Sequence, residues 1–233
     1  MPPPSPTLLL ASASPARRST LLAAGVDPLV RVSSVDEDAV VAAAQELAGG
    51  ALEAADIALL LARAKAEDVV AASDVDEAFG ERGEDVPGGI LVLGCDSVLE
   101  LGGEVHGKPA DAGEAAARWR RMRGSTGVLH TGHWLVDLRD HDGGGTGGMV
   151  GGTASTRVHF VDLDDAEVDA YVATGEPLRV AGAFTLDGLG GPYVAGIEGD
   201  PSNVIGVSLP LLRELVRELG VDWHDLRHPQ ADT

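Results

Sequence analysis

The sequence predicts an α/β fold in which helices flank a mixed, partly antiparallel sheet. Short apolar runs typical of buried strands alternate along the chain with Ala/Leu-rich or amphipathic stretches typical of helices. Two of the later apolar runs flank a Gly-rich loop, which indicates an antiparallel hairpin rather than an all-parallel sheet. The chain has 233 residues, of which 44% are hydrophobic, so it is long and apolar enough to bury a core.

The first third of the chain predicts a strand, a tight Ser-rich turn and a helix. Residues 1–6 are rich in Pro and we expect them to be disordered. The apolar run 7–11 is typical of a buried strand. Ser14 is a favourable N-cap, Pro15 suits the first helical position, and Gly25 suits the position after the last. A second strand over 29–33 and a long Ala/Leu-rich helix over 51–72 follow.

The rest of the chain continues this alternation. Residues 73–89 are acidic and contain Gly, which is typical of an exposed loop. The apolar run 90–93 predicts a strand that ends at Gly94, and the pair Gly102-Gly103 predicts a hairpin turn. We assign residues 7–222 to a single domain and residues 223–233 to a C-terminal tail. Further strands are expected over 128–138, 153–161 and 193–197, and further helices over 112–123, 164–173 and 208–219.

The charge balance excludes two classes of partner. The chain carries 17 Lys and Arg against 37 Asp and Glu, a formal net charge of −20. Nucleic-acid backbones bind through many Lys and Arg contacts, so this composition argues against a nucleic-acid partner. It argues against an anionic membrane surface for the same reason. No apolar stretch approaches the ~18–20 residues that a membrane-spanning helix needs, so we expect no membrane partner.

Cysteine usage favours a reducing compartment. Cys95 is the only cysteine, so no disulfide can form within the chain, and no His/Cys cluster suggests a zinc site. The N-terminus lacks the basic and apolar regions of a signal peptide. We therefore expect a cytoplasmic protein.

Two basic residues are candidate phosphate ligands. Arg17 follows Ser12 and Ser14 at the start of the first helix, where hydroxyls, free backbone N–H groups and a guanidinium can together hold an anion. The alternative is an ordinary capped helix with solvated arginines. Lys108 is held between Gly and Pro after the predicted hairpin, and its alternative is a solvated turn lysine.

Carboxylates and glycines supply the other candidates. Asp96 follows an apolar strand, where α/β sheets usually bind ligands, and could coordinate a divalent metal or accept a proton from water. The alternative is a turn-forming Asp. The acidic cluster 36–38 attracts Mg²⁺ if a donor such as Asp96 approaches, and is otherwise a solvated loop. The Gly-rich segment 181–191 either lets backbone approach a ligand or forms tight turns.

Several familiar chemistries lack support. No Ser sits in a Gly-x-Ser-x-Gly elbow, and Cys95 has no neighbouring His in the sequence, so nucleophilic hydrolysis is not indicated. No G-x-G-x-x-G follows a strand and opens a helix, and the Gly-rich loop 143–148 lacks the Lys-Ser/Thr and the helix of a P-loop.

Taken in order, these segments resemble the Maf family of nucleoside triphosphate pyrophosphatases, from about residue 8 to 220. Any one motif is weak, whereas five or more in register are specific. The tracts 173–177, 181–183 and 197–206 complete the resemblance. The matching motifs are Leu10–Arg17 for L-A-S-x-S-P-x-R, Ser34–Glu37 for D-x-D-E with Ser34 in place of the first Asp, Leu61–Ala66 for L-A-x-x-K-A, Gly94–Ser97 for G-A-D-T, and Gly107–Pro109 for G-K-P.

The resemblance implies a fold, a reaction and a set of site residues. It implies a mixed α/β structure with a central cleft between two lobes, often dimeric, so a homodimer is possible. The implied reaction hydrolyses the α–β phosphate bond of a nucleoside triphosphate to the monophosphate and pyrophosphate, with Mg²⁺ or Mn²⁺ as cofactor. The implied roles are general base for Asp96, metal binding for Glu37 and Asp96, and substrate binding for Ser12, Arg17, Lys65 and Lys108.

The sequence departs from the family at the segments that contact the base. The pyrimidine-preferring branch has D-K-A-G and I-Q-G, whereas this chain has Val180 in place of the Lys and Asp187 in place of the Gln. We keep Asp187 as an expected substrate contact and leave the preferred base open, non-standard or surplus nucleotides included. Two alternatives to the pyrophosphatase stay open: a nucleotide-binding regulator of septum formation or cell division without turnover, and a nucleotidyltransferase that also releases pyrophosphate.

Overall fold

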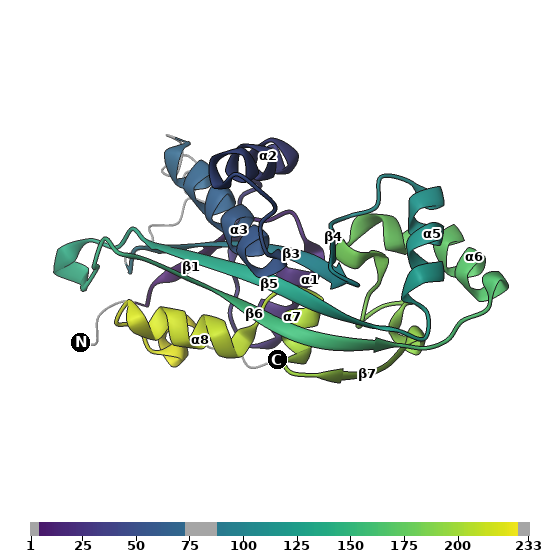
Figure 1. The fold of residues 1–233 in the computed structure, drawn as a ribbon. Coiled ribbons are helices and arrows are strands. Elements are labelled where there is room, and N and C mark those ends of the chain that lie inside the picture. Colours follow the sequence, from purple (N-terminus) through teal and green to yellow (C-terminus); the bar gives the residue numbers. More distant parts are fainter. Residues whose placement is uncertain (1–4, 73–87, 228–233) are drawn as a thin grey trace.

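The computed structural model describes residues 5–72 and 88–227, and every element below lies in these ranges. The strands are β1 (Thr7–Leu10), β2 (Leu29–Val30), β3 (Ile90–Leu101), β4 (Glu104–His106), β5 (Thr126–Asp137), β6 (Met149–Phe160) and β7 (Val194–Glu198). They form a seven-stranded sheet in the order β2-β1-β3-β5-β6-β7, with β4 paired to β3 off this path (Figure 1). β1 runs parallel to β2 and β3, and the other pairs are antiparallel. The predicted mixed sheet is confirmed.

Helices cover both faces of this sheet. They are α1 (Pro15–Ala23), α2 (Glu37–Ala48), α3 (Ala54–Ala71), α5 (Ala112–Met122), α6 (Asp165–Ala173), α7 (Pro201–Ile205) and α8 (Leu209–Glu218). In Figure 1, α3 lies above the long strands and α8 below them. Short 3-10 helices are η1 (His141–Gly143), η2 (Glu176–Arg179), η3 (Ala181–Ala183), η4 (Gly191–Tyr193) and η5 (Trp223–Leu226).

Strand alternation divides the core between the two faces. Leu8 and Leu10 of β1 join the apolar cluster that packs against α1 and α8, whereas Leu9 joins the cluster that packs against α3. Side chains point alternately to opposite faces of a strand, so one short strand anchors helices on both sides. The same alternation continues along β3 and decides which helix each of its polar residues meets.

The long strands pass through two apolar clusters at opposite ends of the sheet. β3 supplies Leu91 and Leu93 to the cluster with α1 and α8, and Leu99 and Leu101 to the cluster with α5 and α6. Trp119 of α5 is fully buried in the second cluster. These clusters are the cores of the two expected lobes, and one continuous sheet joins them.

The main differences from the predicted elements concern three segments. β3 does not end at Gly94 but continues to Leu101. The acidic cluster 36–38 is no loop, because Asp36 caps α2 by accepting from the N–H of Ala39. The short helix α7 was not predicted either; Asp200 caps it. Most of the predicted loop 73–89 lies outside the described residues, and η5 falls in the predicted tail, where Leu226 is buried. The division into domain and tail stays a prediction.

Candidate active site

The candidate site occupies a gap along one edge of β3. β1 ends at Leu10, opposite Leu93, and β4 begins to pair with β3 only at Leu99. Between these points no described strand pairs with that edge of β3. A cavity of about 800 Å³ opens there. The site therefore lies beyond the carboxyl end of the parallel strand β1, where α/β sheets commonly bind ligands.

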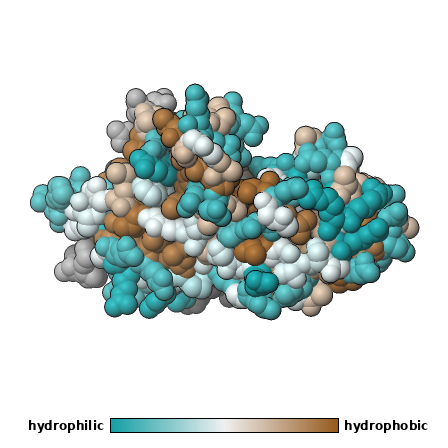
Figure 2. Space-filling model, in the orientation of Figure 1, coloured by the Kyte–Doolittle hydropathy of each residue, from teal (hydrophilic) through white to brown (hydrophobic). Residues whose placement is uncertain are grey.

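The position of Asp96 corrects the sequence-based expectation. We expected it just after a strand, but it lies within β3, paired across to Gly132 of β5. The neighbour that ends here is β1, and its end leaves Asp96 facing the cavity. Figure 2 shows the outline of the molecule hollowed between the part holding α2 and α3 and the part holding α5 and α6.

The structure brings all the predicted site residues to this one cavity. They come from three helices, from β3 and from the loops between elements, and the first and last of them lie 175 positions apart in the chain. The residues that line it are Ser12, Arg17, Glu37, Lys65, Asp96, Lys108 and Asp187.

Lys65 lies between two carboxylates at the floor of the cavity. Its Nζ donates to Oδ1 of Asp96 and lies 2.7 Å from Oε1 of Glu37. Lys65 is 8% exposed and Asp96 6% exposed, so both charges are largely removed from water. Lys65 comes from α3, Asp96 from β3 and Glu37 from the first turn of α2. The cluster therefore depends on the packing of three separate elements.

For both carboxyl groups, burial raises the pKa and Lys65 lowers it, but the balance differs between Asp96 and Glu37. Burial raises the pKa of Asp96, and the charges of Lys65 and Arg17 oppose this without cancelling it. Burial also tends to raise the pKa of Glu37, but the hydrogen bond and charge of Lys65, with help from Lys108 and Arg17, hold it below its ordinary value. Pairs of carboxyl groups whose pKa values are driven apart are typical of sites that transfer protons.

Arg17 is held by neutral oxygen atoms. Its Nε donates to the carbonyl oxygen of Gly206 at 2.8 Å, its NH1 to Oγ of Ser12 at 2.9 Å and its NH2 to Oγ of Ser97 at 3.1 Å. It forms no ion pair with any residue that the structure describes, although it is only 8% exposed. A buried guanidinium without a carboxylate partner favours an anionic ligand. Arg18 instead points outward, where it pairs with Asp27 at 3.4 Å.

A second wall of the cavity comes from η2, η3 and the loop that follows. Arg179, Phe184, Thr185 and Asp187 line it. This wall carries one cation, one anion, a hydroxyl and a phenyl ring, whereas the cations and carboxylates of the floor come from α1, α2, α3 and β3. It joins the rest of the site where the N–H of Gly182 donates to the carbonyl oxygen of Gly107, next to Lys108.

The carboxylates at the floor fit a divalent metal ion that also binds a substrate. Glu37 and Asp96 each bond Lys65 through one oxygen, and their second oxygens form no hydrogen bond with other residues in the described ranges. Mg²⁺ typically takes one or two carboxylate ligands and completes its octahedron with water and phosphate oxygens. Two carboxylates facing a cavity with cations at its rim suit that mode of binding.

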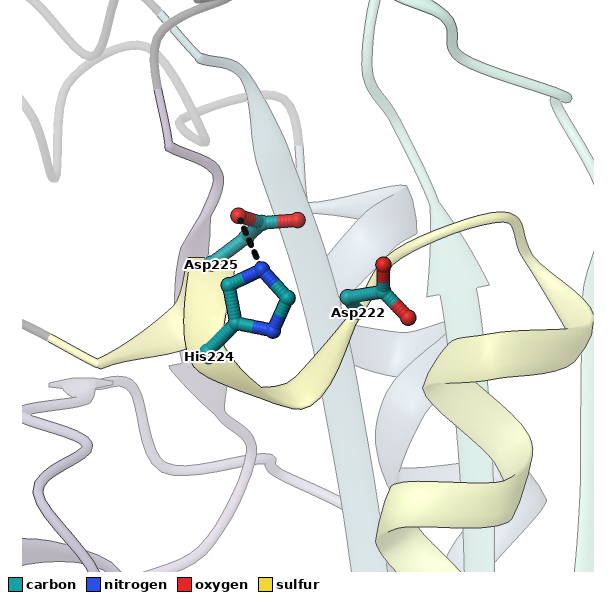
Figure 3. A group of neighbouring side chains, drawn as sticks. All are labelled: Asp222, His224 and Asp225. Atoms are coloured by element: carbon teal, nitrogen blue, oxygen red, sulfur yellow. Dashed lines mark ion pairs between the residues drawn. The ribbon is translucent and has the colours of Figure 1, made fainter.

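One other group of possible metal ligands lies elsewhere. Within the described ranges, only Asp222, His224 and Asp225 place three ligand atoms within 4.8 Å of one another. Figure 3 shows His224 turned towards Asp225, to which it pairs at 3.5 Å. All three are exposed and none lines the 800 Å³ cavity. Exposed acidic groups are common without a metal, and this group is not part of the site.

The sequence analysis did not predict some residues of the site, and it set aside Cys95 as a nucleophile, which the structure supports. Ser97 and Gly206 orient Arg17, and both lie in segments that carry the family resemblance, which was the available signal. Arg179 and Thr185 line the cavity. Cys95 adjoins Asp96 but is fully buried, and burial raises the pKa of its thiol to about 12, so it is no nucleophile.

Comparison with known proteins agrees with this geometry. Residues 7–219 match the family model described as Maf-like protein. The chain belongs to the Maf-like protein family. Every predicted site residue lies inside the matched range. No helix of this Maf-like chain, in the parts that the structure describes, is long and apolar enough to cross a membrane.

Three Maf-like relatives illustrate the similarity, and each carries the name "Nucleoside triphosphate pyrophosphatase". The relative from Leifsonia xyli subsp. xyli is 52% identical over 94% of this chain and 95% of its own length. That from Streptomyces coelicolor is 49% identical over 99% of both chains. The relative from Nostoc punctiforme is 45% identical over 94% of this chain and 97% of its own.

Proposed function

We propose that this Maf-like chain is a nucleoside triphosphate pyrophosphatase, which hydrolyses the α–β phosphate bond and releases a nucleoside monophosphate and pyrophosphate. The names of its relatives support this activity. The observation that carries the proposal is the buried contact of Lys65 with Asp96 and Glu37 in a cavity that Arg17 and Lys108 also line. Two carboxylates, one of them the proposed base Asp96, and three cations thus surround one ligand-sized space.

The cations are assigned to the triphosphate. Pyrophosphate accumulates negative charge as it leaves, so groups that stabilise this charge lower the barrier. Arg17 is pre-oriented by three neutral oxygens and Lys108 forms no ion pair within 4 Å among the residues described, so both charges are free for phosphate oxygens. Ser12 contributes its hydroxyl beside Arg17.

Asp96 is assigned the proton of the attacking water. The water oxygen bonds the α-phosphorus, the bond from that phosphorus to the bridging oxygen breaks, and the proton moves to the carboxylate of Asp96. A raised pKa suits this role, because a base is most effective when its pKa lies near the working pH. Lys65 favours the ionised form of Asp96 and orients its carboxylate.

A divalent metal ion, Mg²⁺ or Mn²⁺, is assigned to Glu37 and Asp96, where it would supply Lewis-acid stabilisation of phosphate charge. The lowered pKa of Glu37 keeps this carboxylate ionised and able to act as a ligand at neutral pH.

The second wall is assigned to the nucleoside. Asp187 offers carboxylate oxygens to N–H donors of a base, and Arg179 offers N–H donors to its carbonyl or ring nitrogen acceptors. Their opposite charges give this wall little attraction for phosphates. A panel of standard and modified triphosphates assayed for pyrophosphate release would identify the preferred base.

The direct test is Asp96→Asn, assayed for pyrophosphate release with Mg²⁺ or Mn²⁺. Loss of a general base typically costs about 10²–10⁴-fold in rate, and we expect kcat to fall by that order. Asp222→Asn is the matched control, because Asp222 is exposed and lies outside the cavity. Activity of Asp96→Asn near that of the control would refute the assignment.

The two alternatives give different results in simple assays. A regulator without turnover would bind a triphosphate in calorimetry but release no pyrophosphate. A nucleotidyltransferase would not place oxygen from labelled water in the monophosphate. We also assign the protein to the cytoplasm, in keeping with its single, buried cysteine, and a homodimer would appear as twice the chain mass in light scattering.

A further inference from the structure

Glu176 at the start of η2 gathers an unusual set of hydrogen-bond donors. Its Oε1 accepts from the hydroxyl of Tyr171 at 3.0 Å, from Oγ1 of Thr185 at 2.5 Å and from the N–H of Gly190 at 3.0 Å. Its Oε2 accepts from the N–H of Leu189 at 3.0 Å. Glu176 itself does not line the 800 Å³ cavity. It therefore acts on the ligand space only through the loop that it holds.

These contacts tie together both ends of the cavity's second wall. Arg179, Val180 and Ala181 come three to five residues after Glu176 in the chain, and Phe184 to Asp187 lie just before the turn that Leu189 and Gly190 form around its carboxylate. The turn is tightly packed, because a Cβ atom at Gly188 would lie 2.5 Å from Oε2 of Glu176. The loop thus folds over the carboxylate of Glu176, and the position of the wall residues in this loop depends on that carboxylate.

The carboxylate is used as an acceptor and not as one half of an ion pair. No cation that the structure describes forms an ion pair with Glu176, and the hydrogen bonds from Thr185, Leu189, Tyr171 and Gly190 hold its pKa below the ordinary value against the effect of burial. An ionised carboxylate has acceptor sites for all four donors. A neutral amide would offer only one oxygen and would present its own N–H groups to donors.

Strain in the same loop shows that it is held in place by its contacts. Ala183 has φ 61°, a left-handed conformation that is uncommon for a residue with a Cβ atom. Its carbonyl oxygen accepts from Nε1 of the buried Trp119 at 2.7 Å. Such conformations persist only where surrounding structure imposes them.

We propose that Glu176 is a positioning residue for nucleoside recognition: it holds the wall of Arg179 and Thr185 to Asp187 against the base and sugar, and leaves the phosphate end unaffected. This inference rests on the proposed function for the assignment of that wall to the nucleoside. The phosphate end is built from Ser12, Arg17, Lys65 and Lys108, and within it Arg17 is supported by Gly206 and Ser97, and Lys65 by Asp96, independently of Glu176.

The test compares two ligands that share phosphates but differ in the nucleoside. The affinity of each variant for a methylene-bridged, non-hydrolysable nucleoside triphosphate and for inorganic pyrophosphate is measured by calorimetry. For Glu176→Gln we expect Kd for the nucleotide to rise by about tenfold and Kd for pyrophosphate to change less than about twofold. In turnover, KM for nucleotides is expected to rise while kcat holds.

Three further variants, one test and two controls, separate positioning from general destabilisation. Tyr171→Phe removes one donor to Glu176 and keeps the ring, so it should weaken nucleotide binding in the same direction but less. Tyr193→Phe is the matched control, because Tyr193 packs against Tyr171 but its hydroxyl does not bond Glu176. Glu218→Gln controls for loss of a surface charge. Both controls should bind nucleotide and pyrophosphate as the wild type does.

The outcomes are distinct. Equal loss of nucleotide and pyrophosphate affinity in Glu176→Gln, or no loss of either, would overturn the inference. These binding measurements need no turnover, whereas the proposed function stands or falls on pyrophosphate release by the wild-type protein. A wild type that binds but does not hydrolyse would therefore refute the activity and leave the role of Glu176 to be decided by the affinities.

Discussion

Arg17 donates from Nε to the carbonyl oxygen of Gly206 over 2.8 Å, joining the first helix to the junction between α7 and α8. A Cβ atom at Gly206 would lie 3.2 Å from this nitrogen, so the contact is close. With Ser12 and Ser97 on its other two nitrogens, the guanidinium is fixed in orientation while its charge is unpaired. The C-terminal part of the chain therefore orients a cation near the N-terminus.

Arg17→Lys should lower kcat/KM for triphosphate hydrolysis by at least about tenfold, because an ammonium cannot reproduce the fork of N–H donors. Arg18→Ala is the neighbouring control, since Arg18 is exposed and pairs with Asp27. Its kcat/KM should stay within about twofold of the wild type, as for most surface substitutions. Steady-state kinetics of pyrophosphate release measure both, and equal effects of the two changes would contradict the assignment of Arg17.

Lys65→Met should destabilise the fold by about 3 kcal/mol, because it leaves the buried Asp96 without its cation. Adding Asp96→Asn should recover at least about 1 kcal/mol, since the uncompensated charge is then gone. Urea denaturation of the single and double variants measures this. Lys108→Met is the control: Lys108 is exposed, so activity should fall while the free energy of unfolding stays close to that of the wild type. Strict additivity of the two changes would show that Lys65 and Asp96 do not interact.

Gly94→Ala should destabilise the protein by at least about 2 kcal/mol, because overpacking against backbone forces helix and sheet apart. A Cβ atom at Gly94 would lie 2.0 Å from the carbonyl oxygen of Ala62 in α3. The same shift would separate Lys65 from Asp96, so activity should fall as well. Gly50→Ala, which meets no atom within 4 Å, should change neither. Thermal melting and pyrophosphate release test this pair, and a neutral Gly94→Ala would contradict the close packing of α3.

His133 should make stability depend on pH between about 6.5 and 4. It is fully buried, and burial, aided by the charge of Arg17, lowers its pKa from 6.5 to about 4. Its Nε2 accepts from the N–H of Ser208 at 2.8 Å, which requires the neutral ring. The unfolded chain therefore takes up a proton first as pH falls. The free energy of unfolding therefore falls by about 3 kcal/mol as pH decreases from 6.5 to 4.

His133→Gln isolates this contribution. The variant should be less stable than the wild type above pH 6.5, and the difference in free energy of unfolding should shrink as pH falls towards 4. Urea denaturation over that range measures both proteins. A difference that stays constant with pH would show that the native His133 titrates like an exposed histidine.

Local signals predicted most of the elements around the site. Ser14 and Pro15 mark the start of α1, Gly102-Gly103 forms the turn between β3 and β4, and β5 pairs with β6 as expected. These features depend on capping, turn geometry and alternation, which act over a few residues. The buried stripe of α8, with Leu212 and Leu215, followed from helical periodicity in the same way.

The errors arose where distant packing overrides local pattern. Gly94 and Asp96 look like the end of a strand, yet β3 continues through both. Gly94 is required within the strand because the backbone of α3 packs against it, and Asp96 is tolerated there because it faces the cavity. The start of α2 looked like an acidic loop, since Asp36 and Glu37 favour solvent and the helix buries no residue fully. Neither the sequence around Gly94 nor that at the start of α2 indicates by itself which distant element it packs against.

The sequence alone determined which chemical groups this protein has and in what order they occur. The resemblance to the family motifs predicted Arg17, Lys65, Asp96 and Lys108 as site residues, and all four line one cavity in the structure.

Only the tertiary structure decided which of these groups touch. Neighbours on a strand point to opposite faces, so β3 turns Asp96 towards Lys65 of α3 and Ser97 towards Arg17 of α1. The early end of β1 then leaves both side chains at an open edge of the sheet. Such contacts join residues far apart in the chain, and only the packing of helices on both faces of one sheet brings them within hydrogen-bond distance.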